Sequence, residues 1–106
     1  MPRLIYTDRA RDDLVRITTY IARVSGRDDV ASRFYSKLRL RCQRLARLPA
    51  AIGTLRPELG DGIRSTPTGN YLILFRYRGG ALEIVTIVEG HRDLADLGLT
   101  NTRNTK

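Results

Sequence analysis

Residues 71–89 read YLILFRYRGGALEIVTIVE, and this stretch decides the fold. Two runs of β-branched, aromatic and leucine residues, Tyr71–Tyr77 and Leu82–Val88, flank the turn sequence RGGA at 78–81. Glycine adopts the positive φ angles that tight turns need, so the stretch predicts an antiparallel β-hairpin. Side chains alternate between the faces of a strand, and both faces of the first run carry apolar residues. We therefore expect one face to lie under helices and the other to be only half covered.

An amphipathic helix is predicted near the start of the chain. It follows the short strand-like run Leu4–Tyr6, begins after Thr7, whose hydroxyl can cap its first turn, and covers residues 8 to 24. Its apolar stripe consists of Ala10, Leu14, Ile17 and Ile21. On the polar side, Asp12 can pair with Arg16 one turn later.

A second helix is predicted after the break at residues 25–27. We expect an aspartate of the pair Asp28–Asp29 to cap it and Pro49 to end it. Residues 33–48 carry six cations and no acid, and Leu40 lies among them as an exposed apolar position. This basic run could bind nucleic acid along a helix or pair with an acidic protein segment, and composition does not separate the two.

The order of the predicted elements defines an α+β domain. Residues 50–70 are rich in proline and glycine and contain one strand-like segment, Gly62–Ser65. The order is therefore β-α-α-β-β-β, which predicts an N-terminal strand and a helical hairpin packed on a small antiparallel sheet. We expect a single domain over residues 1–99 and a polar C-terminal tail over residues 100–106.

Composition limits the classes of function. The 106 residues include 19 Lys and Arg against 11 Asp and Glu, a net charge of +8, so we expect a partner that carries acidic or phosphate groups. Cys42 is the single cysteine, which excludes an internal disulfide and predicts a small core residue. We predict no metal and no cofactor. The sequence shows no secretion leader and no run long enough to span a membrane, so we expect a cytoplasmic location.

Basic residues of the C-terminal half are the candidates for contact with a target. Arg64 and Arg76 fall on predicted strands, and His91 and Arg92 follow the last strand. They could bind phosphates or form a solvated rim. A lone histidine could act as a general acid or base, but such chemistry needs a second proton-transfer group. We therefore predict no catalytic residue.

Five short segments keep a distinctive order and spacing. They are Tyr6-x3-Ala10-x3-Leu14-x2-Ile17-x2-Tyr20-Ile21-Ala22, Leu45-Ala46-x2-Pro49, Ile63-Arg64-Ser65, Tyr71-Leu72-Ile73-Leu74-Phe75-Arg76 and Arg92-Asp93-Leu94. Together they resemble ParE, the toxin of ParD/ParE-type toxin–antitoxin modules in the RelE/ParE superfamily, over residues 3–97. The resemblance implies a helical hairpin against an antiparallel sheet. It also implies a ParD-like antitoxin with a ribbon-helix-helix DNA-binding half and a flexible C-terminal arm.

The resemblance further implies a toxin that inhibits DNA gyrase by protein binding and has no enzymatic activity of its own. The predicted target-binding residues are Arg64, Arg76, His91 and Arg92. The predicted antitoxin-binding residues are Arg16, Tyr20, Arg23, Leu40 and Arg44. We expect the toxin and antitoxin to form a hetero-oligomeric complex.

RelE-like toxins of the same superfamily cleave messenger RNA on the ribosome, and this endoribonuclease activity is the alternative. In that branch an arginine that grips the scissile phosphate follows the tyrosine at the start of the central strand. Here Leu72 follows Tyr71, and only His91 and Arg92 remain as a reduced set of reactive groups. A third alternative is a basic nucleic-acid-binding module without toxicity.

Overall fold

The predicted hairpin forms the centre of the sheet in the computed structural model, which describes residues 3–48 and 51–90. The elements in chain order are β1 (Arg3–Tyr6), α1 (Asp8–Ser25), α2 (Asp28–Arg47), β2 (Thr54–Leu55), the 3₁₀ helix η1 (Pro57–Leu59), β3 (Arg64–Thr68), β4 (Tyr71–Arg78) and β5 (Ala81–Glu89). The strand order in the sheet is β1-β5-β4-β3-β2. Gly79 and Gly80 join β4 to β5 with φ angles of 57° and 76°, as a tight turn requires.

The α+β class is confirmed, but the sheet is mixed and not wholly antiparallel. β1 pairs with β5 in parallel, with Tyr6 opposite Ile84, while the other neighbouring strands are antiparallel. The contact with β5 continues one residue beyond β1, where the Thr7 backbone N–H donates to the Ile84 carbonyl at 3.0 Å before the chain enters α1. The two-residue strand β2 was not predicted, and β3 begins two residues later and ends three residues later than the expected Gly62–Ser65 segment.

Both helices form where the sequence predicts them. Thr7 caps α1, since its Oγ1 accepts a hydrogen bond from the Ala10 N–H at 3.0 Å, and Gly26 ends the helix with a φ angle of 69°. The predicted cap of α2 is wrong. Arg27 occupies that position without a side-chain cap, and Asp28–Asp29 lie in the first turn, where their charges suit the helix dipole.

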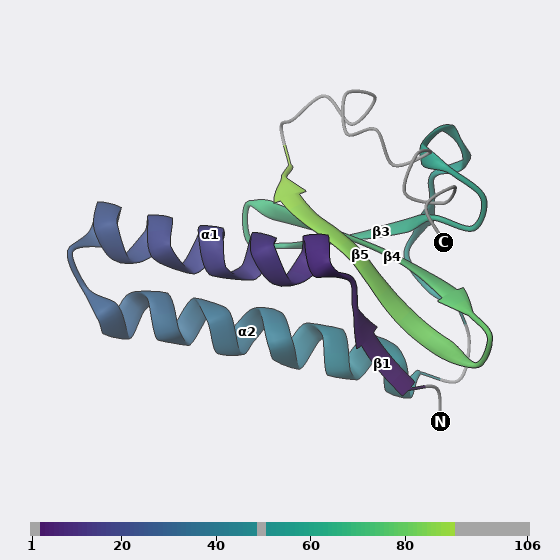
Figure 1. Ribbon diagram of the computed structural model, residues 1–106, viewed down its shortest axis with the longest axis horizontal. Helices are drawn as coiled ribbons and strands as arrows, with labels where there is room; N and C mark the ends of the chain where they lie inside the picture. The colour runs from purple at the N-terminus through teal and green to yellow at the C-terminus, as the bar shows by residue number, and fades with distance from the viewer. Residues whose placement is uncertain (1–2, 49–50, 91–106) are drawn as a thin grey trace.

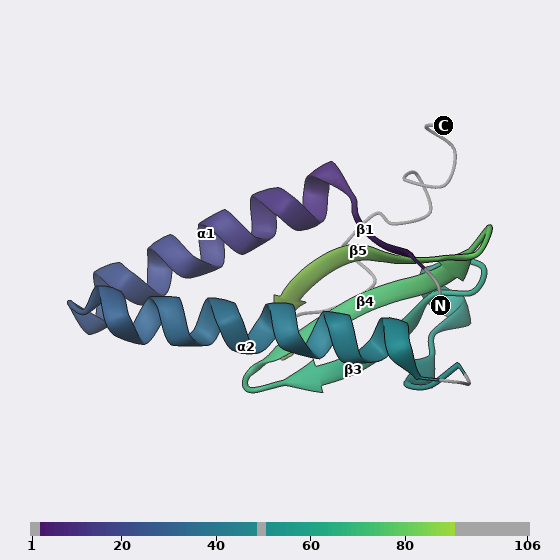
Figure 2. The same cartoon turned by 90° about the horizontal axis from the view of Figure 1, so that it is seen from below.

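The helical hairpin covers one face of the sheet (Figures 1 and 2). The buried residues between the two layers are Ala10, Leu14, Ile17, Leu38, Cys42, Leu45, Ala46, Ile73, Phe75, Leu82, Ile84 and Ile87. Cys42 is fully buried, which confirms its predicted place in the core. Figure 1 shows that the closed end of the hairpin extends beyond the sheet.

The opposite face of the sheet is also buried, which corrects the expectation that it is half open. Leu74, Val85 and Val88 are at most 3% exposed and pack with Leu59 and Ile63. These two residues come from η1 and the segment before β3, so the connection between β2 and β3 contributes to covering this face. The sequence did not indicate this role, because two apolar residues among prolines and glycines have no periodicity.

No helix in the two described ranges is long and apolar enough to cross a membrane.

A candidate partner-binding cleft beside α1

A bulge in β5 sets the position of α1 on the sheet. The register between β4 and β5 shifts between Leu74 and Phe75, which leaves Val85 as an extra residue in β5. The Thr7 hydroxyl donates to the Val85 carbonyl at 2.7 Å. The residue that caps α1 therefore also attaches the helix to the bulge.

A buried carboxylate forms a second attachment one and a half turns into α1. Asp13 is 7% exposed and accepts hydrogen bonds from the Thr86 hydroxyl and, at 3.0 Å, from the Ile87 backbone N–H. Its other oxygen accepts from Arg16 Nη2 at 2.6 Å. The sequence assigned this pairing to Asp12, which is exposed. Asp13 thus connects the sheet to the first arginine of a surface cleft.

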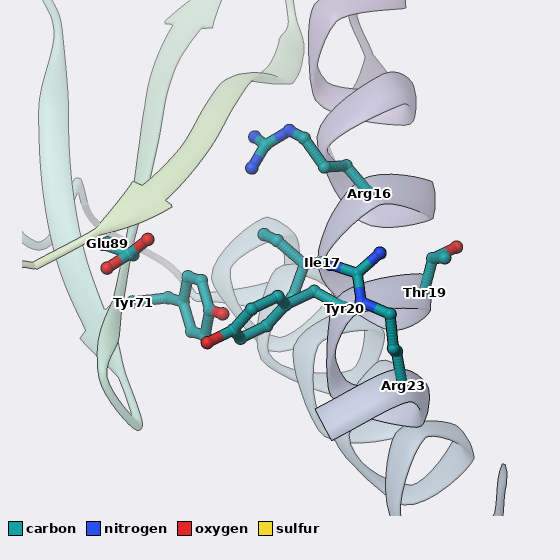
Figure 3. Close-up of a pocket in the computed structure, with 7 residues that line it drawn as sticks. All are labelled: Arg16, Ile17, Thr19, Tyr20, Arg23, Tyr71 and Glu89. Atoms are coloured by element: carbon teal, nitrogen blue, oxygen red, sulfur yellow. The ribbon is translucent and has the colours of Figure 1, made fainter. Parts of the chain in front are cut away.

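The cleft lies between α1 and the end of the sheet where β4 begins and β5 ends. It has a volume of about 460 Å³ and is lined on the helix side by Arg16, Tyr20 and Arg23, which were all predicted to bind an antitoxin. Tyr71 and Glu89 form the wall on the sheet side (Figure 3). The fold therefore brings three of the predicted residues to one place and adds two that were not predicted as site residues.

The cleft offers aromatic surface beside positive charge. Tyr20 is 50% exposed, and the Arg23 guanidinium lies 5.8 Å from the centroid of its ring, a cation–π distance. Figure 3 shows Tyr20 and Tyr71 pointing toward each other across the cleft. Burial raises the pKa of the Tyr71 hydroxyl, and the nearby negative charge of Glu89 raises that pKa further, so this hydroxyl stays protonated and can donate a hydrogen bond.

This chemistry suits a protein segment that carries both a carboxylate and an apolar or aromatic side chain. Guanidinium groups form strong charge-assisted hydrogen bonds with carboxylates, and tyrosine and arginine are enriched among residues that dominate binding energy.

The two remaining antitoxin candidates lie elsewhere. Leu40 is 46% exposed, as predicted, and lines a separate groove with Arg44 between α2 and the end of β3. Their contact with an antitoxin stays a prediction. The predicted set is thus divided between two surfaces, one beside each helix.

Arg64 and Arg76 do not share a surface. Arg76 is 8% exposed, and its Nε donates to Glu83 Oε1 at 2.7 Å across the β4–β5 pair. Arg64 pairs with Phe75 and so points to the helix-covered face, whereas Arg76, the next residue after Phe75, points to the other. One flat partner surface would not reach both arginines.

His91 and Arg92 lie outside the described residues. Within residues 3–48 and 51–90, no three His, Cys, Asp or Glu side chains gather closely enough to hold a metal ion.

The fold and the cleft define a small, basic α+β protein with a surface cleft lined by arginine and tyrosine. The same fold is found in a solved structure described as the chromosomal ParDE TA system from P. aeruginosa, with a TM-score of 0.73 and 21% identity over 84% of this chain and 96% of that chain. The family model described as ParE toxin of type II toxin-antitoxin system, parDE, matches residues 4–94. The chain therefore belongs to the ParE toxin family, which confirms the resemblance found in the sequence. No curated protein matches the chain.

Proposed function

We propose that this ParE toxin inhibits DNA gyrase by protein binding and that a ParD-like antitoxin with a ribbon-helix-helix domain neutralises it. Family membership supports the toxin role, and the net charge of +8 supports an acidic partner. The observation that carries the antitoxin part of the proposal is the α1 cleft, where the exposed Arg16 and Arg23 lie beside the exposed Tyr20 and the half-buried Tyr71.

The antitoxin would contact the toxin at this cleft. An acidic residue of its C-terminal arm would pair with the guanidinium of Arg16 or Arg23, and an adjacent apolar side chain would pack between Tyr20 and Tyr71. Arg16 is held in place by Asp13, so little conformational entropy is lost when it binds a second carboxylate.

Titration of toxin variants with the antitoxin encoded beside the toxin tests this contact. Tyr20→Ala and Arg23→Ala should each raise the dissociation constant roughly tenfold or more, because aromatic and arginine side chains at an interface centre carry most of the binding energy. Arg11→Ala is the matched control, since Arg11 is an exposed arginine of the same helix that does not line the cleft. It should change the constant by less than about twofold. Equal losses in all three variants would exclude the cleft as the antitoxin site.

Plasmid supercoiling by purified gyrase tests the target. The toxin should make gyrase accumulate cleaved plasmid, and an equimolar amount of antitoxin should restore supercoiling. The separate variants His91→Ala and Arg92→Ala test the two predicted target-binding residues. Each should reduce growth arrest and leave the affinity for the antitoxin unchanged. Unimpaired gyrase together with transcripts cut on ribosomes would replace this proposal with the endoribonuclease alternative.

A further inference from the structure

A second groove lies between α2 and the end of β3. It has a volume of about 290 Å³ and is lined by Lys37, Leu40, Arg41, Arg44 and the segment 67–69. It is separate from the α1 cleft, with which it shares no lining residue. Three cations of α2 thus line one wall of this small groove.

These cations have no acidic partner within the part of the chain that the structure describes. The ion pairs there involve other basic residues, such as Arg33 with Asp29 at 3.5 Å. Arg41 Nη2 donates to the uncharged Thr66 hydroxyl at 2.8 Å, which holds the side chain against β3 and leaves its charge unneutralised. In contrast, Arg16 in the α1 cleft is paired with a carboxylate.

The cations also follow a regular spacing. Lys37, Arg41 and Arg44 are separated by four and three residues, so they form one row along a rigid helix. At about 1.5 Å per residue, the row spans about 10 Å of the helix axis. Each strand of duplex DNA carries one phosphate at every step along its backbone, so a row of this length can contact more than one of them.

The other wall of the groove contains an unused hydroxyl. Thr68 is 6% exposed, and its Oγ1 is buried without a hydrogen-bond partner among the described residues. A buried hydroxyl without a partner is uncommon, because leaving it unpaired costs free energy. A phosphate oxygen seated in the groove would supply the missing acceptor once the hydroxyl rotates toward it.

We propose that this groove binds the phosphate backbone of duplex DNA. Arginine and lysine beside a hydroxyl are the groups that contact phosphates in protein–DNA interfaces, and such contacts require no particular base sequence. A straight row of cations on a rigid helix fits a ligand whose charges are also rigidly spaced, which favours a duplex over a flexible acidic peptide. The inference goes beyond the proposed function, since it concerns the free toxin and needs neither gyrase nor antitoxin.

Fluorescence anisotropy with a labelled duplex of about 20 base pairs tests the proposal on the full chain, over a series of salt concentrations. The double variant Lys37→Gln/Arg44→Gln removes two groove charges, and Arg9→Gln/Arg78→Gln removes the same charge from outside the groove. The groove variant should weaken binding roughly tenfold and lower the slope of log K against log salt by about two, one for each lost phosphate contact. The control variant should keep affinity within about threefold of the original chain, because long-range charge alone is largely screened.

Circular dichroism must show that both double variants are folded. The variant Thr68→Val offers a second test of the groove, because it changes no charge. It should weaken duplex binding while leaving the salt slope unchanged.

Three results would overturn the assignment. Equal losses in the two double variants would show that binding follows net charge alone. Tighter binding of an RNA hairpin than of DNA, lost in the groove variant, would assign the groove to RNA. A loss of affinity for the antitoxin or for a polyglutamate peptide, with DNA binding unchanged, would assign it to an acidic protein segment.

Discussion

Asp13 lies three residues after Ala10 and four before Ile17, so it occupies a position on the apolar stripe of α1. An acid at such a position needs hydrogen-bond partners when it is buried. Strand β5 supplies these partners at a point beyond the end of β1. There the Thr86 hydroxyl and the Ile87 backbone N–H both donate to the Asp13 carboxylate. The helical spacing could have indicated Asp13 as a buried residue, but only the fold identifies its partners.

Asp13→Asn is expected to lower the free energy of unfolding by about 2 kcal/mol. The substitution removes the charge from hydrogen bonds that are worth about 1.5 to 3 kcal/mol when charged, and it places an amide group where Thr86, Ile87 and Arg16 all donate. Urea unfolding followed by circular dichroism measures the change. The control Asp12→Asn, at an exposed position, should stay within about 0.5 kcal/mol, and an equal effect of the two would contradict the anchoring role.

Stability is expected to fall with rising pH in the alkaline range. Burial raises the pKa of the Cys42 thiol and also that of the neighbouring Tyr6 hydroxyl in the folded state. Below the unfolded thiol's pKa of about 8.5 both states hold the proton and the stabilisation is complete. Above that pKa the Cys42 thiol loses its proton in the unfolded state before it does so in the folded state. The free energy of unfolding therefore falls by up to about 1.4 kcal/mol per pH unit.

Urea unfolding at several pH values between about 8 and 9.5 measures this slope. Cys42→Ala should be less stable at neutral pH, because it leaves a small cavity, but its stability should fall less steeply over the same interval. The Tyr6 hydroxyl does not mask the difference, since an unfolded tyrosine ionises only near pH 10. Parallel slopes would show that the thiol does not contribute.

At the level of elements, the sequence predicted what local patterns determine. Helical periodicity located α1 and α2, and paired apolar runs with a glycine turn located β4 and β5. The sequence did not predict the parallel pairing of β1, because that pairing depends on contacts between residues far apart in the chain. Thr7 and Val85, for example, are joined by a hydrogen bond across a separation of 78 residues. The buried state of Arg76 was missed for a similar reason, since its partner Glu83 is defined by the register of the hairpin.

The candidate site was predicted in part. Arg16, Tyr20 and Arg23 recur at helical spacing, so one exposed face of α1 could be inferred from the sequence alone. The wall formed by Tyr71 and Glu89 could not, because it depends on where the helix crosses the sheet.

The short strand β2 depends on a glycine at its entrance. A Cβ atom on Gly53 would lie 2.7 Å from the Ser65 carbonyl oxygen and 3.0 Å from Phe75 Cζ, and the residue has a φ angle of 86°. Gly53→Ala should therefore lower the free energy of unfolding by about 2 to 4 kcal/mol, from backbone strain and overpacking together. Gly62 has a similar φ angle of 73° but open space around it, so Gly62→Ala should cost only about 1 kcal/mol. Chemical denaturation of both variants tests the difference, and equal losses would mean that strain alone matters.

For the whole molecule, the net charge of +8 should govern how fast an acidic antitoxin arrives. Electrostatic attraction accelerates encounter and is screened by salt, whereas the packed contacts of the cleft control dissociation. The association rate constant should fall about tenfold between ~50 and ~500 mM NaCl, with a much smaller change in the dissociation rate constant. Stopped-flow mixing at several salt concentrations measures both. An association rate that does not respond to salt would contradict the charge argument.

Within residues 3–48 and 51–90 the first strand is held by the last, since β1 pairs there with β5 alone. During translation β1 and α1 leave the ribosome long before Ala81–Glu89 is made, so these two elements must wait until β5 has been synthesised before they can pack on it. A premature stop codon anywhere before β5 would leave the helical hairpin without most of the surface it packs on. Bacteria that escape the toxin by mutation should therefore carry nonsense and frameshift alleles throughout the region that encodes the elements up to β5.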